Sequence, residues 1–283
     1  MFEMFNLGFM TQAFVAAVIV GLLLAYFGVH VVGRGIVFVD LALGQISSLG
    51  VAVAVYLGTG STWIPIAATL IGAFLLSLIK IKDMRLKQEA IIGIIYAISS
   101  AVTVLLISKS AHGDSDIQEV LFGNILAVSW DQITTIGIIF ALLGIFHFIF
   151  RKQFFELTAK YENNRGDEVG VFNMWNFFFY ISIGLAIVFA VEIGGVIPIF
   201  AYLIIPSVCG IMLSKSRVVV ILSALGLSIL GGFFGLNMSF NYDFPAGSSI
   251  VAVLGIIFVI VSIINIFIDK EEGMTESEAE AAV

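Results

Sequence analysis

Long runs of apolar residues, separated by short polar connections, make up most of the chain. Each run is long enough to cross the roughly 30 Å of hydrocarbon in a bilayer as a helix. Continuous apolar runs exclude a transmembrane β-barrel, whose strands alternate apolar and polar residues. The pattern predicts an all-α, polytopic membrane protein with about nine spans, at Thr11–Val32, Ile36–Leu57, Thr62–Ile79, Ala90–Ile107, Gln132–Phe150, Met174–Val191, Val196–Ser214, Val218–Leu236 and Ser248–Ile268.

The basic residues support this span count independently of hydropathy. Alternate connections collect all but one of the 13 Lys and Arg residues, and only Lys109 lies on the opposite side. Basic residues mark the cytoplasmic side, so the N-terminus is predicted outside and the C-terminus in the cytoplasm. The cytoplasmic set comprises Arg34, Lys80, Lys82, Arg85, Lys87, Arg151, Lys152, Lys160, Arg165, Lys215, Arg217 and Lys270.

Composition narrows the class further. A mean hydropathy of +1.11, with 60% apolar and 12% charged residues, excludes a soluble globular protein. The polar connections are too short to fold alone, so residues 1–270 are predicted to form one transmembrane domain. Residues 271–283 read as an acidic, disordered cytoplasmic tail. The chain has no P-loop sequence, so any ATPase that drives it must be another chain. We expect membrane lipid around the protein and no nucleic-acid partner.

Asp40 is the only acidic or basic residue well inside a predicted span. A carboxylate in hydrocarbon costs about 2.5–3.5 kcal/mol on insertion scales, so such a residue usually faces a polar pathway or a partner. At about 100° per residue, Asp40 shares a helix face with Gly44, Ser47 and Ser48, whereas Gln45 lies about 140° away. A one-residue bulge would be needed to aim Asp40 and Gln45 at one ligand.

Two plainer interpretations of these residues stay open. Asp40 follows Arg34 by less than two helical turns, and the two side chains could pair near the lipid headgroups. Gln45, Ser47 and Ser48 could instead form hydrogen bonds between helices.

A second candidate metal site lies in an outer connection, where His112, Asp114 and Asp116 follow one another closely. Imidazole and carboxylate groups suit a divalent cation such as zinc or manganese. A short loop of this composition is also an ordinary polar turn. His30 and His147, near the cytoplasmic ends of their spans, are typical of packing histidines rather than ligands.

Arg151–Gly170 is the longest internal polar segment, and it mixes aromatic with charged residues. This pattern predicts an amphipathic cytoplasmic helix that either lies on the membrane surface or docks a cytoplasmic partner. Its candidate docking residues are Glu156, Lys160, Glu162, Arg165, Asp167 and Glu168.

Pro206 lies inside a predicted span. Proline frees a backbone carbonyl, so a kink in this helix is predicted. Broken helices in membranes line cavities or interfaces, so Pro206 is a candidate cavity-forming residue.

Four segments together resemble the integral-membrane permeases of ABC transporters that take up zinc, manganese or iron. They are Glu89–Tyr96 (EAIIGIIY), Leu121–Ser129 (LFGNILAVS), Ala201–Pro206 (AYLIIP) and Tyr242–Gly247 (YDFPAG). In the second segment the family usually has Asp where Asn124 stands. The order and spacing fit from about Phe9 to Ile268.

The resemblance implies a homodimer of permeases on two cytoplasmic ATPase subunits, fed by an extracytoplasmic metal-binding protein. ATP would bind the partner subunit, and the divalent metal would be the substrate. The permease itself would have no catalytic site and no cofactor. It would lie in a bacterial plasma membrane, with Arg151–Gly170 as the loop that docks into the ATPase.

The second span departs from the family pattern, which is usually Gly-Asp-x-Leu-x-His-Ala. Here Gln45 stands where the His would be and Leu41 where the Asp would be, with Asp40 one residue early. Asp40 and Gln45 are therefore the candidate intramembrane metal ligands, in an altered site. Two other functions stay open: a cation-coupled secondary transporter, and a membrane scaffold that transports nothing.

Overall fold

The computed structural model describes residues 3–59, 61–79, 88–108, 123–163, 169 and 173–281. Within these residues the protein is helical, and eight helices are long and apolar enough to cross a membrane. A ninth apolar helix, α3, has 16 residues. Together they correspond one by one to the nine predicted spans. We name the helix ends outer or cytoplasmic by the side that the basic residues predict.

The helices in chain order are α1 (Gly8–Arg34), α2 (Val39–Tyr56), α3 (Trp63–Leu78), α4 (Gln88–Ile107), α6 (Trp130–Ile149), α7 (Arg151–Glu162), α8 (Met174–Gly194), α9 (Val196–Leu213), α10 (Arg217–Tyr242) and α11 (Ala246–Ala281). Two short 3-10 turns, η1 (Glu3–Asn6) and η2 (Ile125–Ala127), lie on the outer side.

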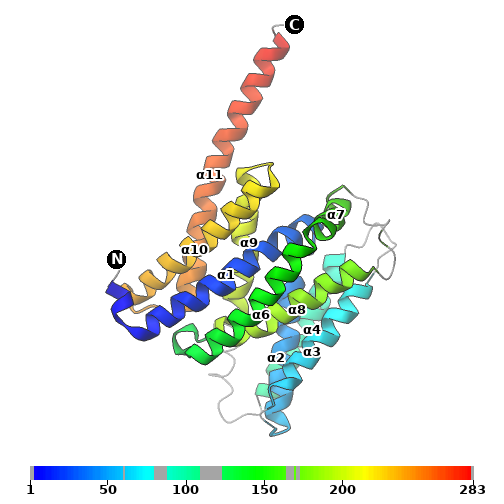
Figure 1. Ribbon diagram of the computed structural model, residues 1–283, viewed down its shortest axis with the longest axis vertical. Coiled ribbons are helices and arrows are strands. Elements are labelled where there is room, and N and C mark those ends of the chain that lie inside the picture. The colour runs from blue at the N-terminus through cyan, green and yellow to red at the C-terminus, as the bar shows by residue number, and fades with distance from the viewer. Residues whose placement is uncertain are drawn as a thin grey trace.

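Helix α1 runs through the centre of the bundle (Figure 1). It packs against α9 and α10 on one side and against α6, α7 and α8 on the other. Two glycines allow this close packing. A side chain at Gly28 would collide with the carbonyl oxygen of Leu203 on α9, and one at Gly21 would meet the ring of Tyr202. Small residues at helix contacts are the usual way in which membrane helices approach one another.

Two groups of helices flank α1 (Figure 1). Helices α2, α3, α4 and α8 pack together, and α9, α10 and α11 form the second group. Helices α1, α2, α8 and α9 hold most of the buried residues, whereas α4, α6 and α11 present apolar side chains outward. Such faces suit a lipid environment.

Local signals explain several helix ends. A capping box begins α6, because the Ser129 side chain accepts from the Gln132 backbone and the Gln132 side chain accepts from the Ser129 backbone. Helix α10 extends beyond the predicted Leu236 to Tyr242. Its polar end stays helical because Asn241 donates to the Asn237 carbonyl at 2.7 Å.

The C-terminal helix α11 continues to Ala281 and projects from the bundle (Figure 1). This helix includes the first part of the acidic segment that starts at residue 271. The disorder of that tail stays a prediction from its composition. The polar Arg151–Gly170 segment contains α7, a separate helix at the cytoplasmic end of α6, as the amphipathic pattern predicted.

Candidate functional sites

Asp40 lies in the first turn of α2 and is 3% exposed. Its Oδ1 atom has no hydrogen-bond partner. Arg34 does not pair with it, because the Arg34 guanidinium forms its hydrogen bonds with Thr158 and Asn176. The predicted pairing of Asp40 with Arg34 near the headgroups is therefore absent. Asp40 is a buried carboxylate with one oxygen atom that has no hydrogen-bond partner.

Gln45 is also buried on α2, but on a different side. Helix α2 is a regular α-helix from Val39 to Tyr56, without the bulge that would align the two residues. Their side chains therefore leave the axis about 140° apart. Ser48 donates to the Gly44 carbonyl of its own helix at 3.0 Å rather than to another helix. In the part of the chain that the structure describes, no three His, Cys, Asp or Glu residues gather as a metal site.

The face of α2 that carries Asp40 points toward the corner between α8 and α9. A side chain at Gly44 would touch Val191 and Val196 at 3.5–3.6 Å. Gly123 and Asn124, on the outer side, pack against the same corner. Gly123, in the left-handed region at φ 66°, packs on the backbone of Gly194, and the next amide donates to the Ile193 carbonyl at 3.2 Å.

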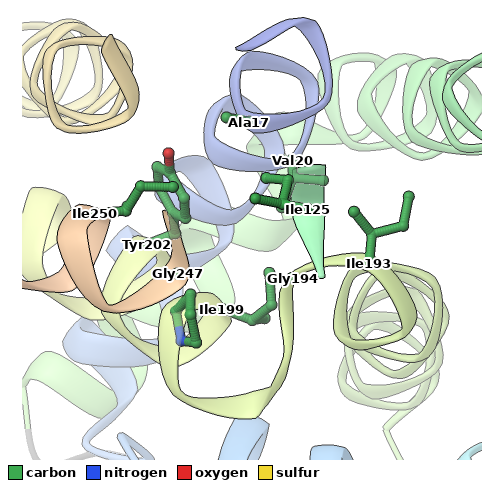
Figure 2. A pocket seen from close by; sticks show the side chains of 10 residues that line it. Ala17, Val20, Ile125, Ile193, Gly194, Ile199, Tyr202, Gly247 and Ile250 are labelled. Atoms are coloured by element: carbon green, nitrogen blue, oxygen red, sulfur yellow. The ribbon is translucent and has the colours of Figure 1, made fainter. Parts of the chain in front are cut away.

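A small apolar cavity lies beside the middle of α1, where α8 ends and α9 begins (Figure 2). We call it the outer cavity, because these ends of α8 and α9 are on the predicted outer side. Its volume is about 10 Å³, room for about one water molecule. The side chains that converge on it come from α1, η2, α8, α9 and α11; they include Val20, Ile125, Ile199, Tyr202 and Ile250. The only hydroxyl among them, on Tyr202, has no hydrogen-bond partner. A cavity with this volume and this apolar lining is too small for a hydrated cation.

At the cytoplasmic end, α7 is bound to α1 by buried polar groups. Thr158 Oγ1 lies 2.8 Å from His30 Nδ1 and accepts from Arg34 Nε at 3.1 Å. Arg34 also donates to Asn176 on α8 at 3.4 Å, and its guanidinium carbon lies 3.7 Å from the centre of the Phe179 ring. Arg34 therefore connects α1, α7 and α8.

Aromatic packing reinforces this junction. The His147 ring stacks on Phe154 of α7 at 4.0 Å and 10°, and neither of its ring nitrogens has a hydrogen-bond partner. His147 is thus a packing histidine, as predicted, whereas His30 is a hydrogen-bonding one. Burial raises the pKa of the Tyr161 phenol on α7, and the nearby Arg34 charge partly opposes this shift.

The opposite face of α7 is exposed. Glu156 and Lys160 lie on it, and Glu156 pairs with Lys152 at 4.0 Å. A pair this exposed adds little stability. Glu162 is exposed too, but it lies on the side of Thr158, with its carboxylate next to Gly33 of α1. The other predicted docking residues (Arg165, Asp167 and Glu168) and the predicted outer group (His112, Asp114 and Asp116) lie outside the described residues.

Pro206 is buried inside α9, which continues on both sides of it. Next to it, Ser207 Oγ lies 2.9 Å from the Ala25 carbonyl of α1 and 2.7 Å from the Leu203 carbonyl of its own helix. The region around Pro206 is therefore a contact between α1 and α9. The kink at Pro206 stays a prediction.

Comparison with known proteins decides the family. The profile of the ABC 3 transport family matches residues 6–265, nearly the whole chain. The chain belongs to the ABC 3 transport family. It is therefore an ABC-type transport permease and a multi-pass membrane protein, which sets aside the secondary transporter and the scaffold.

Three relatives of this ABC 3 member illustrate the match. The manganese import system permease protein ScaB of Streptococcus gordonii is 27% identical over 89% of this chain and 90% of its own length. The manganese transport system membrane protein MntC of Halalkalibacterium halodurans is 25% identical over 90% and 87%. A solved structure, PsaBC from Streptococcus pneumoniae in complex with Fab, has a TM-score of 0.76 and 25% identity over 92% of this chain and 94% of that chain.

Sequence reasoning missed the junction around Thr158. The available signal was His30 and Arg34, one helical turn apart at the end of an apolar helix. Their partner lies 124 residues beyond Arg34, so no local pattern identifies it.

Proposed function

We propose that this chain is the membrane-spanning subunit of an ABC importer for a divalent transition metal, with manganese ahead of zinc and iron. The observation that carries the proposal is the family match over residues 6–265. The chain also aligns with nearly the whole length of relatives that are named for manganese transport. The energy would come from ATP bound by a separate subunit, because the sequence of this chain contains no P-loop.

Ligand chemistry favours manganese. Asp40 offers a buried carboxylate oxygen without a partner, and Gln45 offers an amide oxygen. Oxygen ligands suit manganese, whereas zinc prefers imidazole and thiolate. Because the two side chains leave α2 on different sides, we assign Asp40 as the ligand on the transport pathway. Gln45 would act at a separate point of the same pathway.

The outer face supports import. Asp131, Glu192 and Asp243 are exposed there. A field of carboxylates raises the local concentration of cations, as an importer requires. An extracytoplasmic metal-binding protein would deliver the ion to this face, and His112, Asp114 and Asp116 belong to the same side.

The cytoplasmic face would receive the ATPase on α7. Glu156 and Lys160 present both charges on the exposed face of α7, and Glu162 is exposed at its end, while Phe154, Leu157 and Thr158 are buried against the transmembrane helices. Arg165, Asp167 and Glu168 follow directly in the sequence and would extend this docking surface. Two copies of the permease would bind two ATPase subunits, and lipid would cover the remaining apolar surface.

The test is uptake of radioactive manganese, zinc and iron into proteoliposomes that contain this chain with its cognate ATPase. Uptake is measured with and without ATP on the cytoplasmic side, for the wild type, Asp40→Asn and Ser48→Ala. The serine is the matched control, because it lies on the same face of α2 and bonds within its own helix.

We expect ATP-dependent uptake of manganese, reduced about tenfold or more by Asp40→Asn, as for loss of a group that determines metal affinity. Ser48→Ala should retain most of the uptake. Uptake that survives in Asp40→Asn would keep the function and remove Asp40 from the pathway. A complete complex that transports none of the three metals with ATP would overturn the proposed function.

A further inference from the structure

Buried hydrogen bonds connect α7, the predicted ATPase-docking helix, to α1. Helix α7 packs mainly against α1, with smaller contacts to α8 and α6. Its central buried residue, Thr158, is 2% exposed and bonds to both His30 and Arg34. We call these hydrogen bonds the Thr158 clasp.

One assignment of the hydrogen atoms gives each donor to Thr158 an acceptor lone pair. The Thr158 hydroxyl donates to the Phe154 carbonyl at 3.0 Å, which leaves its two lone pairs to accept from Arg34 Nε–H and His30 Nδ1–H. His30 then carries its proton on Nδ1, and its Nε2 accepts from the Tyr26 hydroxyl at 3.2 Å. The Thr158 hydroxyl, both ring nitrogens of His30 and the Tyr26 hydroxyl each have a partner in this set, whereas Arg34 Nη2, which is also buried, has none. The two hydrogen bonds to Thr158 join α7 to α1 inside the protein, where such bonds are stronger than in water.

Helix α1 continues this rigid connection toward the outer side. It is locked to α9 where Gly28 meets Leu203, and to Tyr202 and α10 at Gly21. Farther out, Ala17 and Val20 form part of the wall of the outer cavity. Packed helices of this kind shift as bodies instead of deforming continuously.

We propose that the Thr158 clasp makes α7 and α1 one mechanical unit, so that Thr158 is the positioning residue through which the ATPase moves α1 and the outer cavity. The inference rests on the proposed function, because it assigns a route for the coupling in that importer. Without the clasp, α7 could shift with the ATPase while α1 stays in place. ATP hydrolysis would then continue without transport.

The first test replaces Thr158 in the complete complex with its ATPase, in proteoliposomes. Thr158→Val keeps the shape and the methyl group but removes the hydroxyl, and Thr158→Ser keeps the hydroxyl. Thr134→Val is the matched control, because Thr134 is an exposed helical threonine that bonds only within α6, to the Trp130 carbonyl at 2.8 Å. The readouts are metal ions transported per ATP hydrolysed and the stimulation of ATP hydrolysis by the metal-binding protein.

Thr158→Val should assemble and hydrolyse ATP, while the ions transported per ATP fall about fivefold or more, the lower end of typical coupling between sites. Thr158→Ser and Thr134→Val should resemble the wild type. A Thr158→Val complex that transports as many ions per ATP as the wild type would overturn the inference. If the wild type itself transports no metal, the proposed function fails instead, and the stimulation of hydrolysis still reports on the clasp.

A second test replaces the clasp with a covalent bond, in case Thr158→Val fails to assemble. A Cβ built on Gly33 lies 2.8 Å from Thr158 Cγ2. The two Cβ atoms are therefore at most about 4.3 Å apart, within the range of disulfides. Gly33→Cys with Thr158→Cys in a Cys209→Ala background leaves only this pair, because Cys209 is the one native cysteine.

The oxidised pair should transport as many ions per ATP as the wild type, and its reduction should uncouple transport from hydrolysis. The Cys209→Ala chain, with oxidant and with reductant, is the control. A disulfide that forms but leaves transport uncoupled would show that α7 acts on the pathway without α1.

Discussion

Asp40→Asn should make the protein more stable while it lowers transport. The substitution keeps the size of the side chain and removes a charge whose Oδ1 atom has no partner in the folded protein. A charged Asp costs about 2.5–3.5 kcal/mol at the bilayer centre and less near a helix end, and the N-terminus of α2 returns about 0.3–1 kcal/mol. The expected gain in unfolding free energy is therefore about 1–2 kcal/mol.

Unfolding of the purified permease in detergent micelles by increasing SDS measures this gain. The fluorescence of Trp63, Trp130 and Trp175 reports the transition. Ser48→Ala is the control, since it loses one hydrogen bond inside α2 and should be destabilised by no more than about 1 kcal/mol. If Asp40→Asn is less stable than the wild type, Asp40 has a structural role and the argument that it is retained for transport is refuted.

Gly28→Ala should destabilise the fold by about 1–3 kcal/mol, because the added carbon would meet the Leu203 carbonyl carbon at 2.8 Å, against an ordinary contact of about 3.5–4.0 Å. Gly144→Ala on α6, where nothing lies within 4 Å of the added carbon, should be neutral or more stable by about 0.5–1 kcal/mol. SDS unfolding of both variants measures these changes in stability. Equal effects at the two glycines would contradict the packing argument. Ser129→Ala should remove the capping box of α6 and lower stability by about 1 kcal/mol, whereas Ser108→Ala, on an exposed helix end with a bond to the carbonyl of Leu105, should change it much less in the same assay.

The sequence allowed the architecture to be predicted because hydropathy and charge act over the length of one helix. Each of the nine spans lies at an apolar run, and the amphipathic Arg151–Gly170 segment contains α7. The predicted end of α10, Leu236, was six residues too early. The polar residues beyond it stay helical, and there the Asn241 side chain donates to the Asn237 carbonyl.

The candidate sites were predictable only where the geometry is local. The angle between Asp40 and Gln45 follows from helical periodicity alone, and the structure confirms a regular α2. The Thr158 clasp was not predictable, because His30 and Thr158 are 128 residues apart. Burial of Asp40 without a salt bridge could also not be foreseen, since the true partner of Arg34 comes from α7.

The long sequence separation inside the clasp has a consequence for biogenesis. When α1 leaves the ribosome, the residues that will bind Arg34 are not yet synthesised, since Thr158 follows by 124 positions and Asn176 by 142. During that interval Arg34 reaches to the cytoplasmic surface, where water solvates the guanidinium. Its burial therefore comes after insertion of the first helices and marks the arrival of α7 and α8. A chain that ends before Thr158 lacks both partners of the Arg34 guanidinium, so truncation there leaves this cation without its bonds inside the protein.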